Sequence, residues 1–162
     1  MIGIDTLHID TITVLKKRHV CIKSFPKVVY EMKSLETLLV DGNGVGIERL
    51  DKDVARLTKL ENINLLKTAL VSLPPEIGRL QNLKALYVNW GRLSNVPPEI
   101  GLLQNLEHLD LSGNELTSLP TEMSRLNKLK TLRLAANPIS EPEQQRIKSL
   151  LPNCHVQFAY KK

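Results

Sequence analysis

The C-terminal half of the chain carries histidine, aspartate and serine at alternate positions, as His108, Asp110 and Ser112. These side-chain types could act as a general base, an orienting carboxylate and a nucleophile. Alternation predicts that all three share one face of a β-strand, with about 7 Å between successive side chains. A catalytic relay needs hydrogen-bonded heavy atoms about 3 Å apart, so this spacing is too wide. Because the four histidines also lack the spacing of metal ligands, we expect no catalytic residues and no enzyme activity.

Potential oxygen ligands for a hard cation occur in the glycine-rich segment 41–48, DGNGVGIE, which resembles the opening of a calcium-binding loop. Asp41, Asn43 and Glu48 could supply oxygen atoms, the ligand type that calcium binds. Lys52, however, stands where such a loop requires a glutamate. The favoured interpretation is a glycine turn that accommodates a two-residue insertion, so we expect no metal and no cofactor. Calcium bound by Asp41, Asn43 and Glu48 is the alternative.

The chain is basic, with 22 Lys and Arg residues against 17 Asp and Glu residues and a net charge of +5. This balance permits binding to nucleic acid or to an acidic surface without requiring it. A short basic run, Lys16-Lys17-Arg18-His19, has no aromatic platform beside it on which bases could stack. We interpret the run as a solvated surface or a weak patch for anions, and we do not expect a nucleic-acid partner.

A repeating pattern of leucines must position these candidate residues. Segment 106–128 has the skeleton L-x-x-L-x-L-x-x-N-x-L-x-x-L-P, and the pattern recurs 23 residues earlier at 83–105 and again at 60–82. This period and this order of leucines resemble the leucine-rich repeat. Each L-x-L core predicts a short strand, and successive strands should stack into one parallel sheet with the leucines pointing inward.

The repeat frame predicts a single domain over residues 1–162. Its parts, in order, are a lead-in at 1–8, repeats near 9–34, 35–59, 60–82, 83–105, 106–128 and 129–139, a C-terminal cap at 140–158 and a tail at 159–162. Within the cap, Ser140 is the expected N-cap of a helix over 141–151, with Glu143 completing a capping box. Residues 155–158 should form a last short strand, and the cap as a whole should cover the open end of the core.

The resemblance to the leucine-rich repeat family extends from Ile9 to Phe158. Segment 72–83, SLPPEIGRLQNL, resembles the short-repeat class of bacterial and plant intracellular proteins, and segment 137–158 resembles the C-terminal cap of small bacterial members. The resemblance implies an α/β solenoid, a right-handed superhelix with a parallel β-sheet on the concave side, turns and 3-10 segments on the convex side and a helical C-terminal cap.

The same resemblance implies a non-catalytic scaffold that recognises a protein partner through the concave sheet, and it leaves the identity of that partner open. Members of this kind include cytoplasmic scaffolds as well as secreted or surface-exposed proteins that bind host proteins. The alternative function is therefore a secreted or surface bacterial protein of the adhesion type, with calcium as a conceivable aid.

Strand positions between the inward leucines should face the concave surface, in columns that cross the sheet. The first column is predicted to contain Thr11, Thr37, Asn62, Ala85, His108 and Thr131. The second contains Thr13, Leu39, Asn64, Tyr87, Asp110 and Arg133, and the third contains Leu15, Asp41, Leu66, Asn89, Ser112 and Ala135. A fourth column near the rim contains Lys16, Gly42, Lys67, Trp90, Gly113 and Ala136. A ladder of asparagines that hydrogen-bond the backbone after each strand should be present at Asn43, Asn114 and Asn137 and interrupted at Lys17, Thr68 and Gly91.

Trp90 is the only tryptophan and falls outside the core frame, in the same repeat as the outward-facing Tyr87. Exposed aromatic and apolar residues ringed by polar ones are the usual composition of a binding hot spot. The favoured interpretation places a protein partner on the concave face, where the predicted contact residues are Leu66, Tyr87, Asn89, Trp90, His108, Asp110 and Arg133. The alternative is that Trp90 packs over the adjacent bend and fills the space left by Gly91.

No apolar run approaches the ~18 residues of a membrane span, and the N-terminus lacks the basic and apolar regions of a signal peptide. We therefore expect a cytoplasmic protein, with a secreted or surface protein whose leader has been removed as the alternative. Cys21 and Cys154 fall in the first and last coils of the repeat frame. A disulfide needs Cα atoms within about 7 Å, and the first and last coils of the frame are farther apart than that. We therefore interpret both cysteines as buried thiols.

Overall fold

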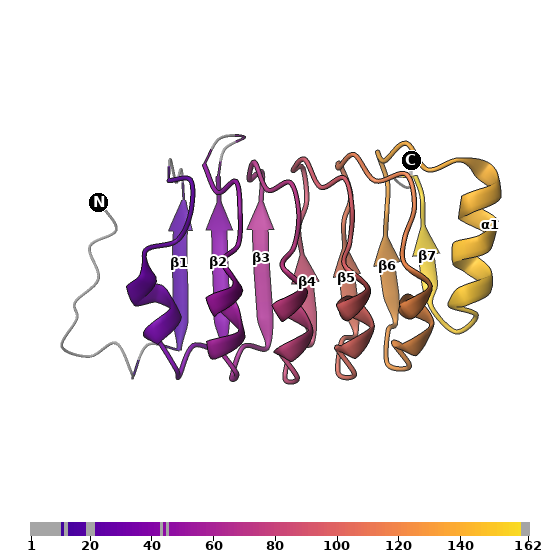
Figure 1. Cartoon of the computed structure of the whole chain (residues 1–162). Coiled ribbons are helices and arrows are strands. Elements are labelled where there is room, and N and C mark those ends of the chain that lie inside the picture. The colour runs from indigo at the N-terminus through magenta and orange to yellow at the C-terminus, as the bar shows by residue number, and fades with distance from the viewer. Residues whose placement is uncertain (1–10, 12, 19–21, 43, 45, 160–162) are drawn as a thin grey trace.

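The computed structural model describes residues 11, 13–18, 22–42, 44 and 46–159. Within them, seven strands form one parallel sheet in sequence order from β1 to β7 (Figure 1). The strands are β1 (Val14–Arg18), β2 (Thr37–Asp41), β3 (Asn62–Leu66), β4 (Ala85–Tyr87), β5 (His108–Asp110), β6 (Thr131–Arg133) and β7 (His155–Gln157). Between them lie the 3-10 segments η2 (Lys27–Glu31), η3 (Lys52–Arg56), η4 (Pro75–Arg79), η5 (Pro98–Leu102) and η6 (Thr121–Arg125), and the helix α1 (Glu141–Leu150) precedes β7.

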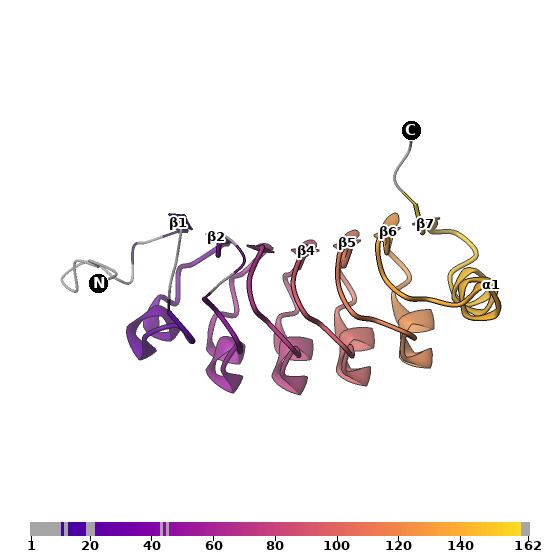
Figure 2. The same cartoon turned by 90° about the horizontal axis from the view of Figure 1, so that it is seen from above.

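The chain winds as a solenoid with the strands in one layer and the 3-10 segments in the opposite layer (Figure 2). Seen from above, both layers are bowed, and the strands lie along the inner side of the curve. This arrangement confirms the predicted fold class, with a parallel sheet on the concave side, 3-10 segments on the convex side and a helical cap at the C-terminal end.

The leucines of the repeat frame fill the space between the two layers. In the best-matching repeat, each of six leucines is at most 4% exposed: Leu106, Leu109, Leu111, Leu116, Leu119 and Leu126. Burial of a leucine side chain contributes about 1.5–3 kcal/mol of hydrophobic stabilisation. Because neighbouring coils fill the same positions, their leucines pack on one another and form one continuous core.

Asparagine side chains hydrogen-bond the backbone at the bends after two strands, as the pattern predicted. Asn114 donates from Nδ2 to the carbonyl oxygens of Val88 (2.7 Å) and Leu111 (2.9 Å), and its Oδ1 accepts from the N–H of Leu93 (3.0 Å). Asn137 makes the equivalent set of bonds one repeat later. Each asparagine therefore ties its own bend to the bend of the preceding coil.

The ladder is interrupted at Thr68 and Gly91, again as predicted, whereas Asn43 lies outside the described residues. A Cβ atom on Gly91 would lie 2.9 Å from Oδ1 of Asn114. The missing side chain at Gly91 thus leaves room for the asparagine of the next repeat. Thr68 is 1% exposed, and its hydroxyl has no hydrogen-bond partner among the described residues.

A second set of repeated contacts joins the 3-10 segments on the convex side. Gln81 donates from Nε2 to the carbonyl oxygens of Gly78 (2.7 Å) and, in the next coil, Leu102 (3.1 Å). A Cβ atom on Gly78 would lie 2.5 Å from the carbonyl oxygen of Glu99, so only glycine allows the two coils to approach this closely. Both features recur one coil later.

The predicted register of the first strand is wrong by three residues. The sequence pattern placed Thr13 opposite Leu39, but Lys16 lies opposite Leu39 in the sheet. The concave residues of β1 are therefore Val14, Lys16 and Arg18, and all three are exposed.

The inward residues of β1 explain this error. Leu15, which was predicted to face the concave surface, is buried opposite Leu38 at 6% exposure. Lys17 takes the next inward position, opposite Val40, and not the asparagine position of the ladder. A lysine at an inward position hides the L-x-L pattern of β1. The sequence pattern therefore predicts a strand three residues too early, at the apolar residues upstream.

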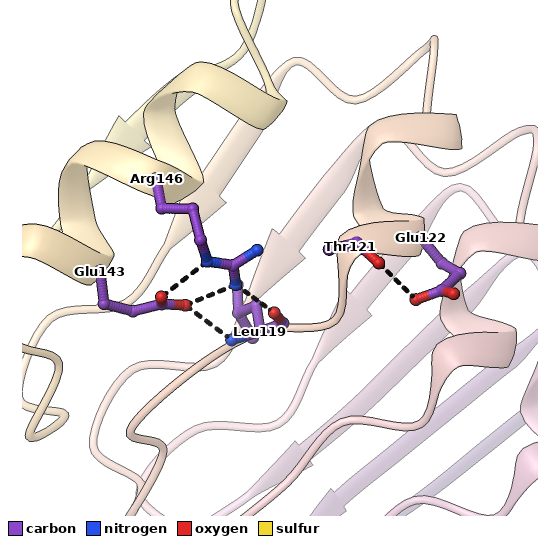
Figure 3. Close-up of polar contacts among 5 residues, drawn as sticks. All are labelled: Leu119, Thr121, Glu122, Glu143 and Arg146. Atoms are coloured by element: carbon purple, nitrogen blue, oxygen red, sulfur yellow. Dashed lines mark hydrogen bonds and ion pairs between the residues drawn. The ribbon is translucent and has the colours of Figure 1, made fainter.

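The C-terminal cap closes the solenoid by a different set of bonds from the predicted capping box. Ser140 occupies the N-cap position of α1 but makes no side-chain capping hydrogen bond. Glu143 instead accepts from the backbone N–H of Leu119 (3.2 Å) and from Nε of Arg146 (2.7 Å), and Arg146 also donates to the carbonyl oxygen of Leu119 (Figure 3). The pair therefore anchors α1 to the preceding repeat.

Cys154 is half-buried between the cap and the last repeats. Burial raises the pKa of its thiol to about 11, so the protonated form predominates at neutral pH. Cys21, the other cysteine, lies outside the described residues.

Candidate functional site

The concave side of the sheet presents three columns of side chains. From β1 to β7 the first column is Val14, Thr37, Asn62, Ala85, His108, Thr131 and His155. The second is Lys16, Leu39, Asn64, Tyr87, Asp110, Arg133 and Gln157. The third begins with Arg18, Asp41 and Leu66 and continues past the shorter strands through Asn89, Ser112 and Ala135. From Thr37 onward this register agrees with the predicted columns.

The central group of predicted contact residues forms a partly apolar area. Leu66, Tyr87 and Asn89 are all partly exposed, and Leu39 joins them from β2. Neighbouring parallel strands are about 4.8 Å apart, so these side chains form a contiguous area on β2, β3 and β4. The area combines apolar and amide groups, the mixture that protein-binding surfaces use.

Trp90 lies at the rim of this area, and half of its side chain (50%) is exposed. Its backbone is left-handed, with φ of 55°. The ring packs on Gly113 of the next repeat, where a Cβ atom would lie 2.6 Å from Cε3. A Cβ atom on Gly91 would lie 2.9 Å from Oδ1 of Asn114, so the asparagine borders the space left by Gly91. The alternative, that the ring fills this space, stays a prediction.

The left-handed backbone of Trp90 is part of a row that crosses the coils. Lys67 (φ 49°), Trp90 (55°), Gly113 (68°) and Ala136 (54°) occupy equivalent positions at intervals of 23 residues. A non-glycine residue in this conformation costs about 1–2 kcal/mol. Three residues of the row, Trp90 among them, thus carry a side chain in a conformation that favours glycine.

The C-terminal group of predicted contact residues differs in exposure: Arg133 is exposed, His108 is partly exposed and Asp110 is buried. His108 shares a hydrogen bond of 2.9 Å between its Nδ1 and Oγ1 of Thr131. Asp110 is only 9% exposed; its Oδ1 accepts from the backbone N–H of Ser112 (3.0 Å), and its Oδ2 lies 3.7 Å from Nη1 of Arg133. A hollow of about 500 Å³ is lined by Asp110, Ser112, Thr131, Arg133, Ala135, His155 and Gln157, and His108 is not part of its lining.

The hydrogen bonds in this hollow do not form a catalytic relay. Within the described chain, no hydrogen bond joins the side chains of His108, Asp110 and Ser112 to one another, and Asp110 bonds only to the backbone N–H of Ser112. The Ser112 hydroxyl is buried without a partner among the described residues, and His108 bonds to Thr131. His108 and Asp110 belong to β5 and Ser112 follows it, at the alternate positions that the sequence predicted.

A second, smaller hollow of about 270 Å³ lies at the N-terminal end of the concave face. It is lined by Lys16, Lys17, Arg18, Leu39, Val40, Asp41, Asn64 and Leu66. Sequence reasoning did not place Lys16 and Arg18 on this face at their correct positions. Counting back one period of 23 residues from Leu38 to Leu15 would have found the register.

The predicted calcium ligands lie in separate environments. Asp41 ends β2 opposite Arg18, and Oε1 of Glu48 lies 3.4 Å from Nζ of Lys23. Asn43 is outside the described residues. Across the described ranges, no group of three or more His, Cys, Asp or Glu side chains is placed to hold a metal ion.

None of the helices in the described ranges has the length and hydrophobicity needed to cross a bilayer. The longest, α1, has 10 residues, whereas a membrane-spanning helix needs about 20.

Comparisons with known proteins agree with the architecture. Residues 81–139 match the family model for the leucine rich repeat. No curated protein sequence matches the chain. Among solved structures, a leucine-rich repeat protein of Leptospira interrogans is 30% identical, over 84% of this chain and 40% of that one, with a TM-score of 0.61.

Two further structures have the same fold. The plant peptide hormone receptor RGFR1, solved in complex with RGF2, is 28% identical over 82% of this chain and 21% of its own, with a TM-score of 0.70. The functional domain of InlJ from Listeria monocytogenes, which includes a cysteine ladder, is 19% identical over 90% of this chain and 29% of its own, with a TM-score of 0.71. The chain thus spans 21–40% of the length of these three proteins.

Proposed function

We propose that this leucine-rich repeat protein is a non-catalytic scaffold that binds a protein partner through the concave face of its sheet. The observation that carries the proposal is the position of Trp90. Half of its side chain is exposed at the rim of a partly apolar area, and its backbone adopts a conformation that is unfavourable for a residue with a side chain.

The neighbouring side chains supply what a partner would contact. Leu66 and Tyr87 are partly exposed on adjacent strands, and Asn89 adds amide donors and acceptors. Aromatic residues at the centre of an interface often contribute 2 kcal/mol or more, roughly, to binding. Because the strands hold these residues in place before binding, little conformational entropy is lost when a partner docks.

The proposed binding needs no cofactor. The proposal names the concave face as the binding surface, and it is the same for a protein inside the cell and for one on the cell surface. A scaffold inside the cell and a bacterial surface protein that binds a host protein would use the same concave residues. The plant receptor of similar fold was solved with RGF2 bound, which supports recognition of a polypeptide as the general class of function.

The test is site-specific photo-crosslinking in an extract of the source cells. A photo-reactive phenylalanine analogue replaces Tyr87 on the concave face or, as a matched control, Leu102, which is a 45% exposed apolar residue on the convex side. We expect a discrete crosslinked protein from position 87 only. Excess unlabelled wild-type protein should suppress it, whereas the Trp90→Ala variant should compete less well. Crosslinking from position 102 alone, or from neither position, would contradict the proposal.

A further inference from the structure

The N-terminal hollow of the concave face brings together two cationic side chains and an apolar floor. Lys16 and Leu39 are register partners on β1 and β2, and Asn64 follows on β3. One step along the strands, Arg18 lies opposite Asp41, which lies opposite Leu66 on β3. The three strands stand side by side at the N-terminal end of the sheet (Figure 1).

The cations of this hollow are available to a ligand. Lys16 and Arg18 are exposed, and their side chains form no ion pair or hydrogen bond with the described residues. Asp41 is the single carboxylate in the lining. Two exposed positive charges against one negative charge make the hollow attractive to an anion.

The floor of the hollow favours a ligand that is also apolar. Leu39 and Leu66 are partly exposed and lie on adjacent strands. The Oδ1 atom of Asn64 is buried and accepts no hydrogen bond from the described residues. Because Asn64 as a residue is partly exposed, rotation of its amide would let a polypeptide backbone that crosses the hollow donate an N–H to this atom.

From this arrangement we infer that the N-terminal hollow binds an acidic residue followed by a leucine-like residue of the protein partner. The carboxylate lies between Lys16 and Arg18, the apolar side chain rests on Leu39 and Leu66, and a backbone N–H of the partner bonds to Asn64. The inference rests on the proposed function and names the chemistry of the partner at one end of the concave face. A nucleic acid would match the cations but would leave the two leucines without apolar contacts.

The experiment titrates the isotope-labelled full chain with capped peptides and follows its NMR signals. The probes are acetyl-Asp-Leu-Leu-amide, the neutral acetyl-Asn-Leu-Leu-amide and acetyl-Asp-Ala-Ala-amide. We expect the first peptide to shift the amide signals of β1 and the methyl signals of Leu39 and Leu66. Each of the other two peptides should bind about fivefold or more weakly, because each lacks one of the two interactions.

Charge reversal provides the matched controls. Lys16→Glu and Arg18→Glu should remove the preference for aspartate over asparagine, and both positions are exposed, so the fold should be retained. Lys27→Glu reverses an exposed charge of the same coil on the convex side and should change nothing. Equal affinity for the aspartate and asparagine peptides, shifts elsewhere on the chain, or the same loss in Lys27→Glu would overturn the inference.

Two additional results separate this inference from the proposed function. If the Tyr87 crosslink forms equally in wild type and in Lys16→Glu, the scaffold function stands and the acidic-residue site is wrong. If the peptides bind as expected and no crosslink forms, the N-terminal hollow does bind an acidic and a leucine-like residue, but the proposed scaffold function is wrong. A single-stranded oligothymidylate that displaces the aspartate peptide at a lower concentration would replace the peptide proposal with nucleic-acid binding.

Discussion

The indole ring of Trp90 lies directly against the backbone of Gly113, one repeat farther along the chain. A methyl group on Gly113 would lie 2.6 Å from Cε3 and 2.7 Å from Cδ2 of the ring. Both residues have a left-handed backbone, with φ of 55° for Trp90 and 68° for Gly113. One face of the ring thus packs against the glycine, and Trp90 as a residue remains 50% exposed to solvent.

Gly113→Ala should displace this ring and destabilise the protein. The added methyl group collides with the indole, and alanine in a left-handed conformation costs about 1 kcal/mol or more. Because Trp90 is the only tryptophan, its fluorescence reports the displacement without ambiguity. Gly44→Ala is the control, since Gly44 has φ of 83° but, apart from its chain neighbours, no heavy atom of the described residues within 4 Å of a new Cβ. The control should lower stability while leaving the emission unchanged; identical spectra for both variants would show that the ring does not depend on Gly113.

Gly101→Ala should lower the free energy of unfolding by about 1–3 kcal/mol, the usual cost of overpacking. A Cβ atom on Gly101 would collide with the carbonyl oxygen of Glu122 on the next coil, so the two 3-10 segments must separate. Urea denaturation measures the change. Ser124→Ala, at the equivalent position of η6, is exposed and should change stability by less than about 0.5 kcal/mol. A tolerated alanine at position 101 would disprove the close approach of the coils.

Asn114→Ala should be among the most damaging polar substitutions in the chain. It leaves the carbonyl oxygen of Val88 and the N–H of Leu93 without their side-chain partner in a buried bend, whereas the carbonyl oxygen of Leu111 still accepts from Asn137. Each buried group left unsatisfied costs about 1–3 kcal/mol. Asn105→Ala removes two exposed bonds, one to the carbonyl oxygen of Gln81 and one from Nζ of Lys128, and should cost much less. Similar melting temperatures for the two variants would contradict a structural role for the ladder.

Glu143 should make the stability of the C-terminal cap depend on acid pH. Hydrogen bonds from Arg146 and then from the N–H of Leu119 hold the pKa of its carboxylate below the usual 4.5. A lowered folded-state pKa contributes stability above about pH 4.5, and that stability is lost as the pH falls through the folded value.

Glu143→Gln should therefore be less stable than wild type at pH 7, and the two curves should converge as the pH falls toward 3. Thermal unfolding across this range gives the measurement. Glu122→Gln removes only the exposed bond from Thr121 and should scarcely change the melting temperature at pH 7 (Figure 3). A constant difference between wild type and Glu143→Gln at every pH would contradict the ionic role.

Calcium should leave the melting temperature unchanged. Asp41 ends a strand, and Glu48 pairs with Lys23 in the neighbouring coil, so neither carboxylate is held ready for a cation. A ligand of the folded state must raise the melting temperature as its concentration increases. Millimolar calcium is compared with magnesium and with a chelator; a rise specific to calcium would restore the alternative that the glycine-rich turn binds it.

Much of the architecture follows from repetition in the sequence. The period of 23 residues predicted the parallel sheet and the inward leucines, and it placed Thr37, Asn62, Ala85, His108 and Thr131 in one column. Each prediction depended only on whether a position faces the core or the solvent, which the leucine pattern reports locally. The pattern failed at Lys17, because a lysine at an inward position of a terminal repeat carries no hydrophobic signal.

Other features were decided by contacts between coils. Glu143 fits a capping box by its spacing, yet its carboxylate bonds to Leu119, 24 residues away. Trp90 was correctly placed outside the core frame, but its contact with Gly113 depends on the absence of a side chain in the next repeat. Leucine periodicity thus determined the coil, the sheet and the core of this protein. The partner of each polar or aromatic side chain was decided only by the tertiary structure, because such contacts depend on the size and hydrogen-bonding groups of residues one coil away.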